Sequence, residues 1–199
     1  MTKKKIMIVE DERIIAEDLK MMLENFGYDI VCVSSTGNQA IESVMQYDID
    51  LVTMDINLGE GMSGLEAAKK LFKEHDIPIV FISAYASNKI FEDAKISCPY
   101  GYIIKPFIEK ELKAALEIIF YKIDMEKALK ESEKKYRNIF ENIQDVYFEA
   151  DITGHLTVIS PSVQKIFQHT PEEVIGQKLR YFCKDSFEAD KYLEEVLSK

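Results

Sequence analysis

Four short apolar runs of the sequence each end in side chains that could take part in chemistry. Glu10 and Asp11 follow the first run, Asp55 follows a later one, and Ser83 and Lys105 stand at the ends of two more. A single acid after a strand is usually only solvated. Carboxylates, a hydroxyl and an amine at successive strand ends would instead meet at one rim of a parallel sheet, where such sheets bind ligands.

The chemistry available to such a set is phosphoryl transfer. Converging carboxylates repel one another and need a cation, and Mg²⁺ suits them because it prefers hard oxygen ligands. A carboxylate can then attack phosphorus and form an acyl phosphate. A lysine and a serine hydroxyl can stabilise the phosphoryl oxygens. The set therefore predicts an in-line transfer that depends on positioning and charge neutralisation.

The elements that must position these residues alternate over the first 120 residues or so. Buried strands are predicted at 6–9, 30–33, 51–55, 79–83 and 101–104, and helices at 13–26, 38–45, 65–74 and 88–94. Strands that are apolar throughout and alternate with helices indicate a parallel sheet covered on both faces. The predicted fold class is therefore α/β, a doubly wound sheet of five strands in the order 2-1-3-4-5.

From Glu109 the pattern is helical for about thirty residues. Its apolar positions are Leu112, Leu116, Ile119 and Ile123, followed with a displacement of one residue by Leu129, Ser132, Tyr136, Ile139 and Ile143. Glu, Lys and Ser dominate 124–135, which favours a coiled-coil-like connector over a long helix packed on its own domain. We expect a homodimer through this helix, which lysines at Leu116 and Ile119 would dissolve.

After residue 142 the pattern changes to a hairpin and short helices. Strands are predicted at 146–151 and 156–160 around a Thr-Gly turn, and helices at 163–168 and from Pro171. The chain should thus end in an α+β segment.

The strand ends and the residues around them resemble the response-regulator receiver family over about residues 5–122. The motifs are Ile-Val-Glu-Asp at 8–11, Val-Thr-Met-Asp-Ile at 52–56, Ile-Ser-Ala at 82–84 and Tyr-Ile-Ile-Lys-Pro-Phe at 102–107. The resemblance implies that Asp55 is the phosphoacceptor. It implies that Mg²⁺ is bound by Glu10, Asp11, Asp55 and the backbone carbonyl of Asn57.

The same resemblance assigns the remaining residues of the rim. Lys105 would contact the phosphate, Ser83 would be the switch hydroxyl, and Tyr102 the switch aromatic. Phosphorylation would draw in Ser83, and Tyr102 would move into the space that it leaves. Pro106 would follow a cis peptide bond. One departure is the loop at 58–64, which has Gly59 where typical receivers have proline and is one residue longer.

The second segment resembles the first half of a PAS domain. The motifs are Tyr-Arg-Asn-Ile-Phe-Glu-Asn at 136–142, the turn at 151–154, Ser-Pro-Ser at 160–162 and the helix start at 170–176. We therefore predict a receiver at 1–122, a helical linker at 123–138 and the N-terminal part of a PAS sensor domain at 139–199. Such a chain would be a fragment of a longer regulator or hybrid histidine kinase.

Composition bears on the partners. The formal net charge of −10 argues against a nucleic-acid partner, and the sequence has no run of about 20 apolar residues that could span a membrane. Three scattered cysteines fit the reducing cytoplasm. The expected phosphodonor is a histidine kinase or phosphotransfer protein.

Two other functions compete with a phosphorylation switch. The chain could be a Mg²⁺-dependent phosphatase or hydrolase on a similar sheet, but the residue two past Asp55 is Asn57, which cannot act as an acid. A pseudo-receiver that only binds is disfavoured because every active-site residue type is present. We expect a phosphoacceptor domain and not an enzyme.

Overall fold

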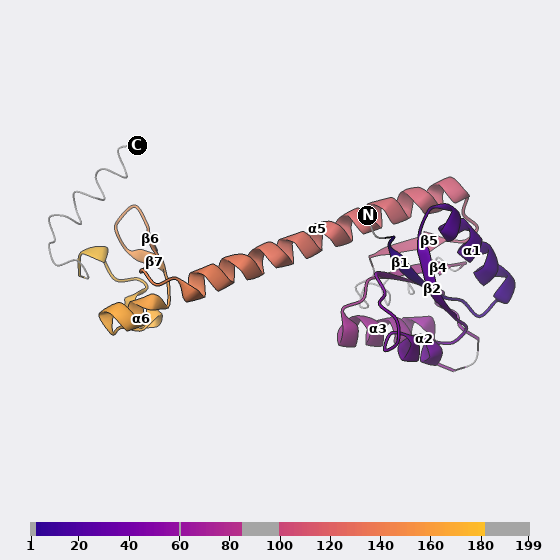
Figure 1. The fold of residues 1–199 in the computed structure, drawn as a ribbon, viewed down its shortest axis with the longest axis horizontal. Coiled ribbons are helices and arrows are strands. Elements are labelled where there is room, and N and C mark those ends of the chain that lie inside the picture. The colour runs from indigo at the N-terminus through magenta and orange to yellow at the C-terminus, as the bar shows by residue number, and fades with distance from the viewer. Residues whose placement is uncertain (1–2, 60, 85–99, 182–199) are drawn as a thin grey trace. The chain divides into compact units, whose positions relative to one another are not determined.

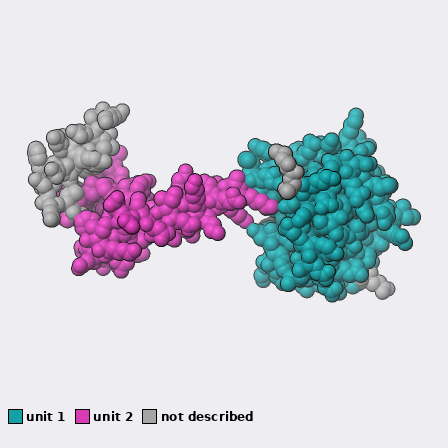
Figure 2. Space-filling view, in the orientation of Figure 1, with its two compact units in different colours: residues 1–125 teal, residues 126–199 magenta. Residues whose placement is uncertain are grey.

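The computed structural model describes residues 3–59, 61–84 and 100–181 (Figure 1). The chain divides into two compact units, Met1–Met125 and Glu126–Lys199 (Figure 2). The predicted helix at 88–94 lies outside the described residues, and the predicted division at 122 and 138 stays a prediction.

The first unit is built on a parallel sheet of five strands. They are β1 (Lys5–Val9), β2 (Asp29–Ser34), β3 (Leu51–Met54), β4 (Ile79–Ser83) and β5 (Gly101–Ile104). Their order is β2-β1-β3-β4-β5, and all neighbouring pairs are parallel. Every residue of β3 and β4 is buried, which is why both strands are apolar nearly throughout. The predicted fold class and strand order are confirmed.

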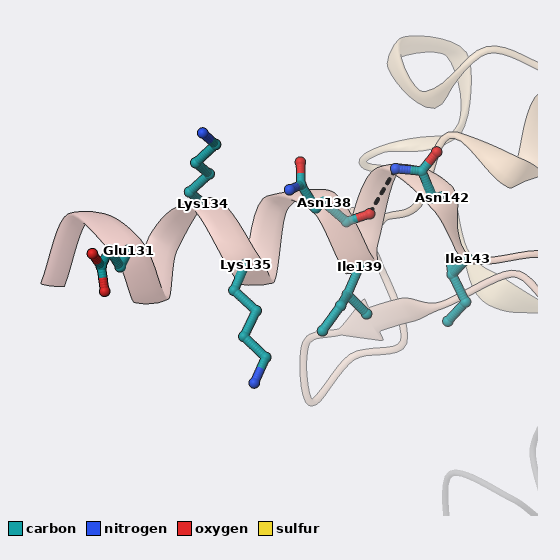
Figure 3. Close-up of a pocket in the computed structure, with 7 residues that line it drawn as sticks. All are labelled: Glu131, Lys134, Lys135, Asn138, Ile139, Asn142 and Ile143. Carbon is teal, nitrogen blue, oxygen red and sulfur yellow. Dashed lines mark hydrogen bonds between the residues drawn. The ribbon is translucent and has the colours of Figure 1, made fainter. Parts of the chain in front are cut away.

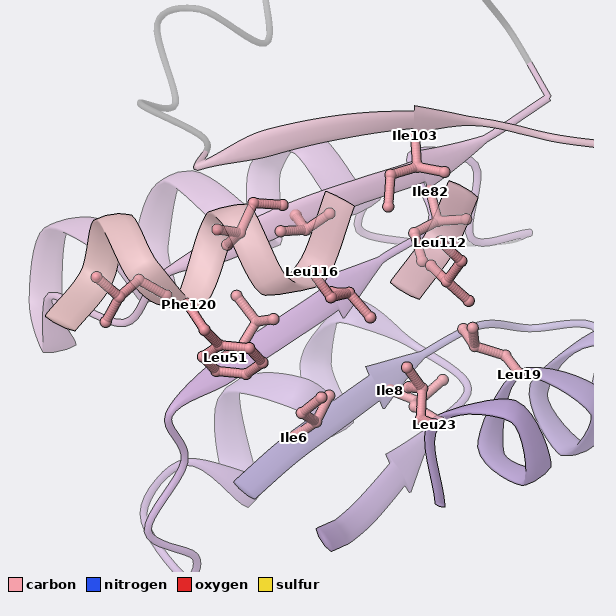
Figure 4. Close-up of a cluster of buried hydrophobic side chains, with 13 residues drawn as sticks. Ile6, Ile8, Leu19, Leu23, Leu51, Ile82, Ile103, Leu112, Leu116 and Phe120 are labelled. Carbon is pink, nitrogen blue, oxygen red and sulfur yellow. The ribbon is translucent and has the colours of Figure 1, made fainter. Parts of the chain in front are cut away.

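Helices cover both faces of this sheet. They are α1 (Arg13–Asn25), α2 (Gly37–Ser43), α3 (Gly64–His75) and α5 (Glu109–Asn142). One apolar layer joins the sheet to α1 and α5, and Figure 4 shows Leu112, Leu116 and Phe120 of α5 in it above the strands. A second layer lies between the sheet and the helices α2 and α3.

The first half of α5 is part of the core of its own unit. Leu112, Leu116, Ile119 and Ile123 are all buried there. The expectation that Leu116 and Ile119 form a dimer interface is therefore wrong, because the sheet already covers them. The helical period identifies an apolar face but not what covers it.

Residues just before β1 and β2 also contact α5 near the end of its buried part. Lys4 forms an ion pair with Asp124, and its ammonium lies 5.6 Å from the centre of the Phe120 ring. The ring of Tyr28 packs on Phe120 with 5.1 Å between their centres. None of the described helices, the 34-residue α5 included, is long and apolar enough to cross a membrane.

The second unit contains an antiparallel hairpin and short helices. Its elements are β6 (Phe148–Ala150), β7 (Leu156–Ile159), α6 (Ser162–Phe167), α7 (Pro171–Val174) and a 3₁₀ turn, η1 (Leu179–Tyr181). β6 is shorter than predicted because the Tyr147 amide donates to the Ser160 hydroxyl instead of to a ladder carbonyl. Thr170 and Glu173 form a capping box at the start of α7, with Pro171 in its first turn.

Shortening a side chain on the buried face of α5 should lower the free energy of unfolding far more than shortening one on its exposed face. Leu116 is fully buried and Ile118 is 69% exposed on the same helix. Leu116→Ala should lower the free energy of unfolding of the first unit by roughly 2–5 kcal/mol. Ile118→Ala should change it by about 0.5 kcal/mol or less. Urea unfolding followed by circular dichroism measures both, and equal losses would contradict the placement of this face in the core.

Candidate functional site

The predicted site residues lie at one rim of the sheet because the strand ladder continues one residue past three strands. The amide of Glu10 donates to the carbonyl of Ser34 at 3.0 Å. In the same way the amide of Asp55 donates to the carbonyl of Val9 at 2.9 Å, and the amide of Lys105 donates to the carbonyl of Ser83 at 3.0 Å. These bonds fix the backbone from which each functional side chain projects.

Lys105 joins two carboxylates at this rim. Its Nζ lies 2.7 Å from Glu10 Oε2 and 2.7 Å from Asp55 Oδ2. The side chains of Lys105, Glu10 and Asp55 are only 15%, 3% and 11% exposed. A buried ammonium thus compensates two buried carboxylates, which would otherwise repel one another.

Burial governs the protonation of this cluster. It raises the pKa of Glu10 above its ordinary value, against the opposing hydrogen bond and charge of Lys105. Burial alone would lower the pKa of Lys105, but the hydrogen bonds and charges of Asp55 and Glu10 outweigh it and raise that pKa. Glu10 Oε1 is buried with no hydrogen-bond partner among the described residues. The rim therefore has an acceptor that a further cation or donor could satisfy.

Asp55 is held by the backbone on two sides. Its Oδ1 accepts a hydrogen bond from the amide of Asn57 at 3.0 Å. A Cβ at Gly64 would lie 1.8 Å from the carbonyl oxygen of Asp55, so only glycine lets α3 begin there. This role of Gly64 was not predicted from the sequence, although a glycine directly after the helix cap Ser63 was a usable signal.

Ser83 and Tyr102 are in contact. Ser83 is fully buried at the end of β4. Burial raises the pKa of the Tyr102 phenol and the Asp55 charge adds to this, while a hydrogen bond from Ser83 lowers it. The Tyr102 ring packs against Phe81, with 6.4 Å between ring centres. The two predicted switch residues are thus already linked.

The other predicted residues are exposed at the edge of this cluster. Asp11 and Asn57 lie on the surface. Gly59 has a φ of 47°, and a Cβ there would lie 3.2 Å from Asp11 Oδ2, so the loop packs closely on that acid. In the part of the chain that is described, no three acidic, His or Cys side chains are already grouped as a metal site. The peptide bond before Pro106 is cis.

The second unit has an apolar cavity of its own. It measures about 230 Å³. It is lined by Val146, Phe148, Leu156, Ile159, Val163, Phe167 and Leu179. None of these described lining residues is titratable, so the polar cluster of the first unit is the stronger candidate for chemistry.

Comparison with protein families matches both segments. Residues 6–117, more than half of the chain, match the response regulator receiver domain, and residues 134–197 match the PAS fold.

Relatives and solved structures agree with the first match. The transcriptional regulatory protein PdtaR of Mycobacterium tuberculosis is 32% identical over 115 residues, which are 58% of this chain and 56% of that protein. This chain thus spans about half the length of that curated relative. The receiver domain of a modulated diguanylate cyclase from Desulfovibrio desulfuricans G20 has a TM-score of 0.59 and 31% identity, covering 63% of this chain and 99% of that one.

A second solved structure is the N-terminal domain of a response regulator/sensory box/GGDEF protein from Carboxydothermus hydrogenoformans. Its TM-score is 0.56 and its identity 32%, over 63% of this chain and 98% of that one. With its strand order, its rim of acids and lysine, and these matches, the chain belongs to the response regulator receiver family and carries a PAS segment after the receiver.

Proposed function

We propose that Asp55 accepts a phosphoryl group from a histidine kinase or phosphotransfer protein and that the receiver passes the resulting change to the PAS segment. The observation that carries the proposal is the Lys105 ammonium, 2.7 Å from Asp55 Oδ2 at the rim of the sheet. A lysine so placed holds a positive charge where phosphoryl oxygens would arrive.

The reaction exchanges one bond to phosphorus for another. A carboxylate oxygen of Asp55 attacks the phosphorus and forms an acyl phosphate. The bond from phosphorus to the donor atom breaks, and the electron pair leaves with the donor, which is an imidazole nitrogen when the donor is phosphohistidine. The Asn57 amide on Asp55 Oδ1 helps to keep the carboxylate oriented for this attack.

The oxygens of this rim fit Mg²⁺. The residues that would hold it are Glu10, Asp11, Asp55 and the carbonyl of Asn57. Two of these carboxylates already share one cation, and Glu10 Oε1 has no partner among the described residues. When bound, the metal would neutralise the carboxylates and the phosphoryl oxygens.

The link between Ser83 and Tyr102 supports a role in switching. A phosphoryl group on Asp55 would compete for the Ser83 hydroxyl, which now bonds to Tyr102. Loss of that bond would free the phenol to move against Phe81, a local charge event with a structural consequence.

The proposal also includes the cellular location of the chain and its partners. Scattered cysteines favour the cytoplasm, and the receiver would serve as a phosphoacceptor and not as an enzyme. A second copy of the chain is a further partner. The alternative, a Mg²⁺-dependent phosphatase, would turn over a chromogenic phosphate ester, whereas a receiver would not.

Phosphorylation should be confined to Asp55. With Mg²⁺ and acetyl phosphate, the intact mass should rise by one phosphoryl group, and Asp55→Asn should abolish the increase because the nucleophile is gone. Asp48→Asn, which changes an exposed acid near the other end of β3, should label like the unaltered chain. Labelling that persists in Asp55→Asn would sink the assignment.

Removing Lys105 should make stability depend on pH and Mg²⁺. The pKa of Glu10 is raised in the folded state, so ionisation of this carboxyl lowers the free energy of unfolding. That stability is lost as the pH rises through the raised pKa. Without Lys105 two buried carboxylates stay uncompensated, so Lys105→Met should lose roughly 3–5 kcal/mol at neutral pH. It should lose less at pH 4, and Mg²⁺ should restore part of the loss.

The matched control for this experiment is Lys5→Met, which breaks an exposed ion pair with Asp48. Surface pairs contribute little, so its stability should depend weakly on pH and Mg²⁺. Urea unfolding at pH 4 and pH 7 measures both variants. Equal behaviour of the two would show that Lys105 does not compensate a buried acidic pair.

Ser83→Ala should raise the pKa of Tyr102 further. The hydrogen bond from Ser83 lowers that pKa, so its removal leaves burial and the Asp55 charge unopposed. The effect is measured by NMR titration of labelled Tyr102, before and after phosphorylation. Ser34→Ala, a buried serine at the end of β2, is the control. A phosphorylation-induced change at Tyr102 that survives Ser83→Ala would refute the coupling.

A further inference from the structure

The loop that joins β3 to α3 is fixed at both of its ends. Ile56 and Leu58, near its start, are buried in the apolar layer between the sheet and the helices α2 and α3. At its other end the amide of Gly64 donates to the carbonyl of Ile56 at 3.0 Å. Ser63 and Glu66 form a capping box that begins α3 there. The chain between Leu58 and Ser63 must therefore turn within a short span.

Two glycines with left-handed backbone lie in this turn. Gly59 has a φ of 47° and Gly61 a φ of 107°, values that residues with a side chain rarely adopt. The two glycines differ in what lies beside them. A Cβ at Gly59 would lie 3.2 Å from Asp11 Oδ2, whereas a Cβ at Gly61 would have no neighbour within 4 Å. Of the two, only Gly59 combines the turn with a close approach to a side chain.

The approach of the loop limits the space around the Asp11 carboxylate. Asp11 is exposed, so its side chain would otherwise be free to change rotamer in water. The loop at Gly59 lies so close that one added methyl group would crowd Oδ2. Asp11 follows Glu10, whose Oε1 is buried without a hydrogen-bond partner among the described residues. Because Mg²⁺ requires nearly ideal octahedral geometry, the position of each carboxylate that holds it matters.

We propose that Gly59 positions Asp11 for Mg²⁺ and thereby sets the affinity of the rim for the metal. Its left-handed turn brings the loop against Asp11, and its missing side chain leaves the room that the carboxylate needs. The proline that typical receivers have at this place could not make the same turn, because its ring fixes φ near about −65°. The inference rests on the proposed function, and Gly59 acts only through Asp11.

A pair of glycine substitutions in the full chain tests this role. Gly59→Ala should raise the dissociation constant for Mg²⁺ roughly tenfold, because the new methyl group displaces the Asp11 carboxylate. Gly61→Ala is the matched control, since it adds the same methyl group to the same loop at a positive φ but beside no neighbour. Its dissociation constant should stay within about twofold of the unaltered value. Calorimetric titration with MgCl₂ measures both, and equal values for the two variants would overturn the proposal.

Asp11→Asn tests whether Gly59 acts through Asp11. In that background Gly59→Ala should change the dissociation constant for Mg²⁺ by less than about twofold, because the carboxylate on which it acts is gone. An undiminished effect would show that Gly59 works by another route. If Gly59→Ala does not fold, Gly59→Asn replaces it with the same expected rise, since asparagine enters the left-handed region more readily.

Labelling of Asp55 by acetyl phosphate separates this inference from the proposed function. In Gly59→Ala the Mg²⁺ concentration for half-maximal labelling should rise in step with the dissociation constant, while the rate at saturating Mg²⁺ stays that of the unaltered chain. An unaltered chain that binds Mg²⁺ and labels, with both glycine variants alike, refutes the role of Gly59 alone. An unaltered chain that neither binds Mg²⁺ nor labels refutes the proposed function and this inference together.

Discussion

The rim of the receiver depends on one interaction, the ammonium of Lys105 between the carboxylates of Glu10 and Asp55. Both distances are 2.7 Å and all three side chains are mostly buried. Two buried carboxylates without a cation would destabilise the fold, and a buried lysine without an anion would lose its charge. The cost of assembling the site is therefore largely offset within it, and the strand ladder that holds Glu10, Asp55 and Lys105 makes this possible.

The fold and the membership of this rim were predictable because both depend on local pattern. Strands buried on both faces are continuous apolar runs, so their ends can be read from the sequence, and parallel strands bring those ends together. The pairing inside the rim was not predictable. Side-chain packing between strands far apart in the sequence decides which carboxylate oxygen contacts Lys105. It also decides that Ser83 forms a hydrogen bond with Tyr102. The same holds for Gly64, whose missing Cβ matters only because Asp55 lies against it.

The long helix α5 shows what its sequence pattern could and could not predict. Its period correctly predicted a helix from Glu109 to Asn142, but the pattern could not show what covers each face. Leu116 and Ile119 pack on the sheet of their own unit, whereas Leu129 and Ile139 remain exposed. The displacement of one residue in the apolar pattern marks this change. Before it, the apolar side chains of α5 pack on the sheet, and after it, no described residue covers Leu129 or Ile139. Figure 3 shows Ile139 projecting from this part of the helix.

Strand β5 connects the rim to this helix. Side chains alternate between the two faces of a strand. Tyr102 accordingly packs in the layer with α2 and α3, beside Phe81, while Ile103 packs in the layer with Leu112 and Leu116 of α5. The residue that contacts Ser83 and the residue that supports α5 are thus neighbours in one short strand. A movement of Tyr102 large enough to shift the backbone of β5 would therefore act directly on the packing of Ile103 against α5.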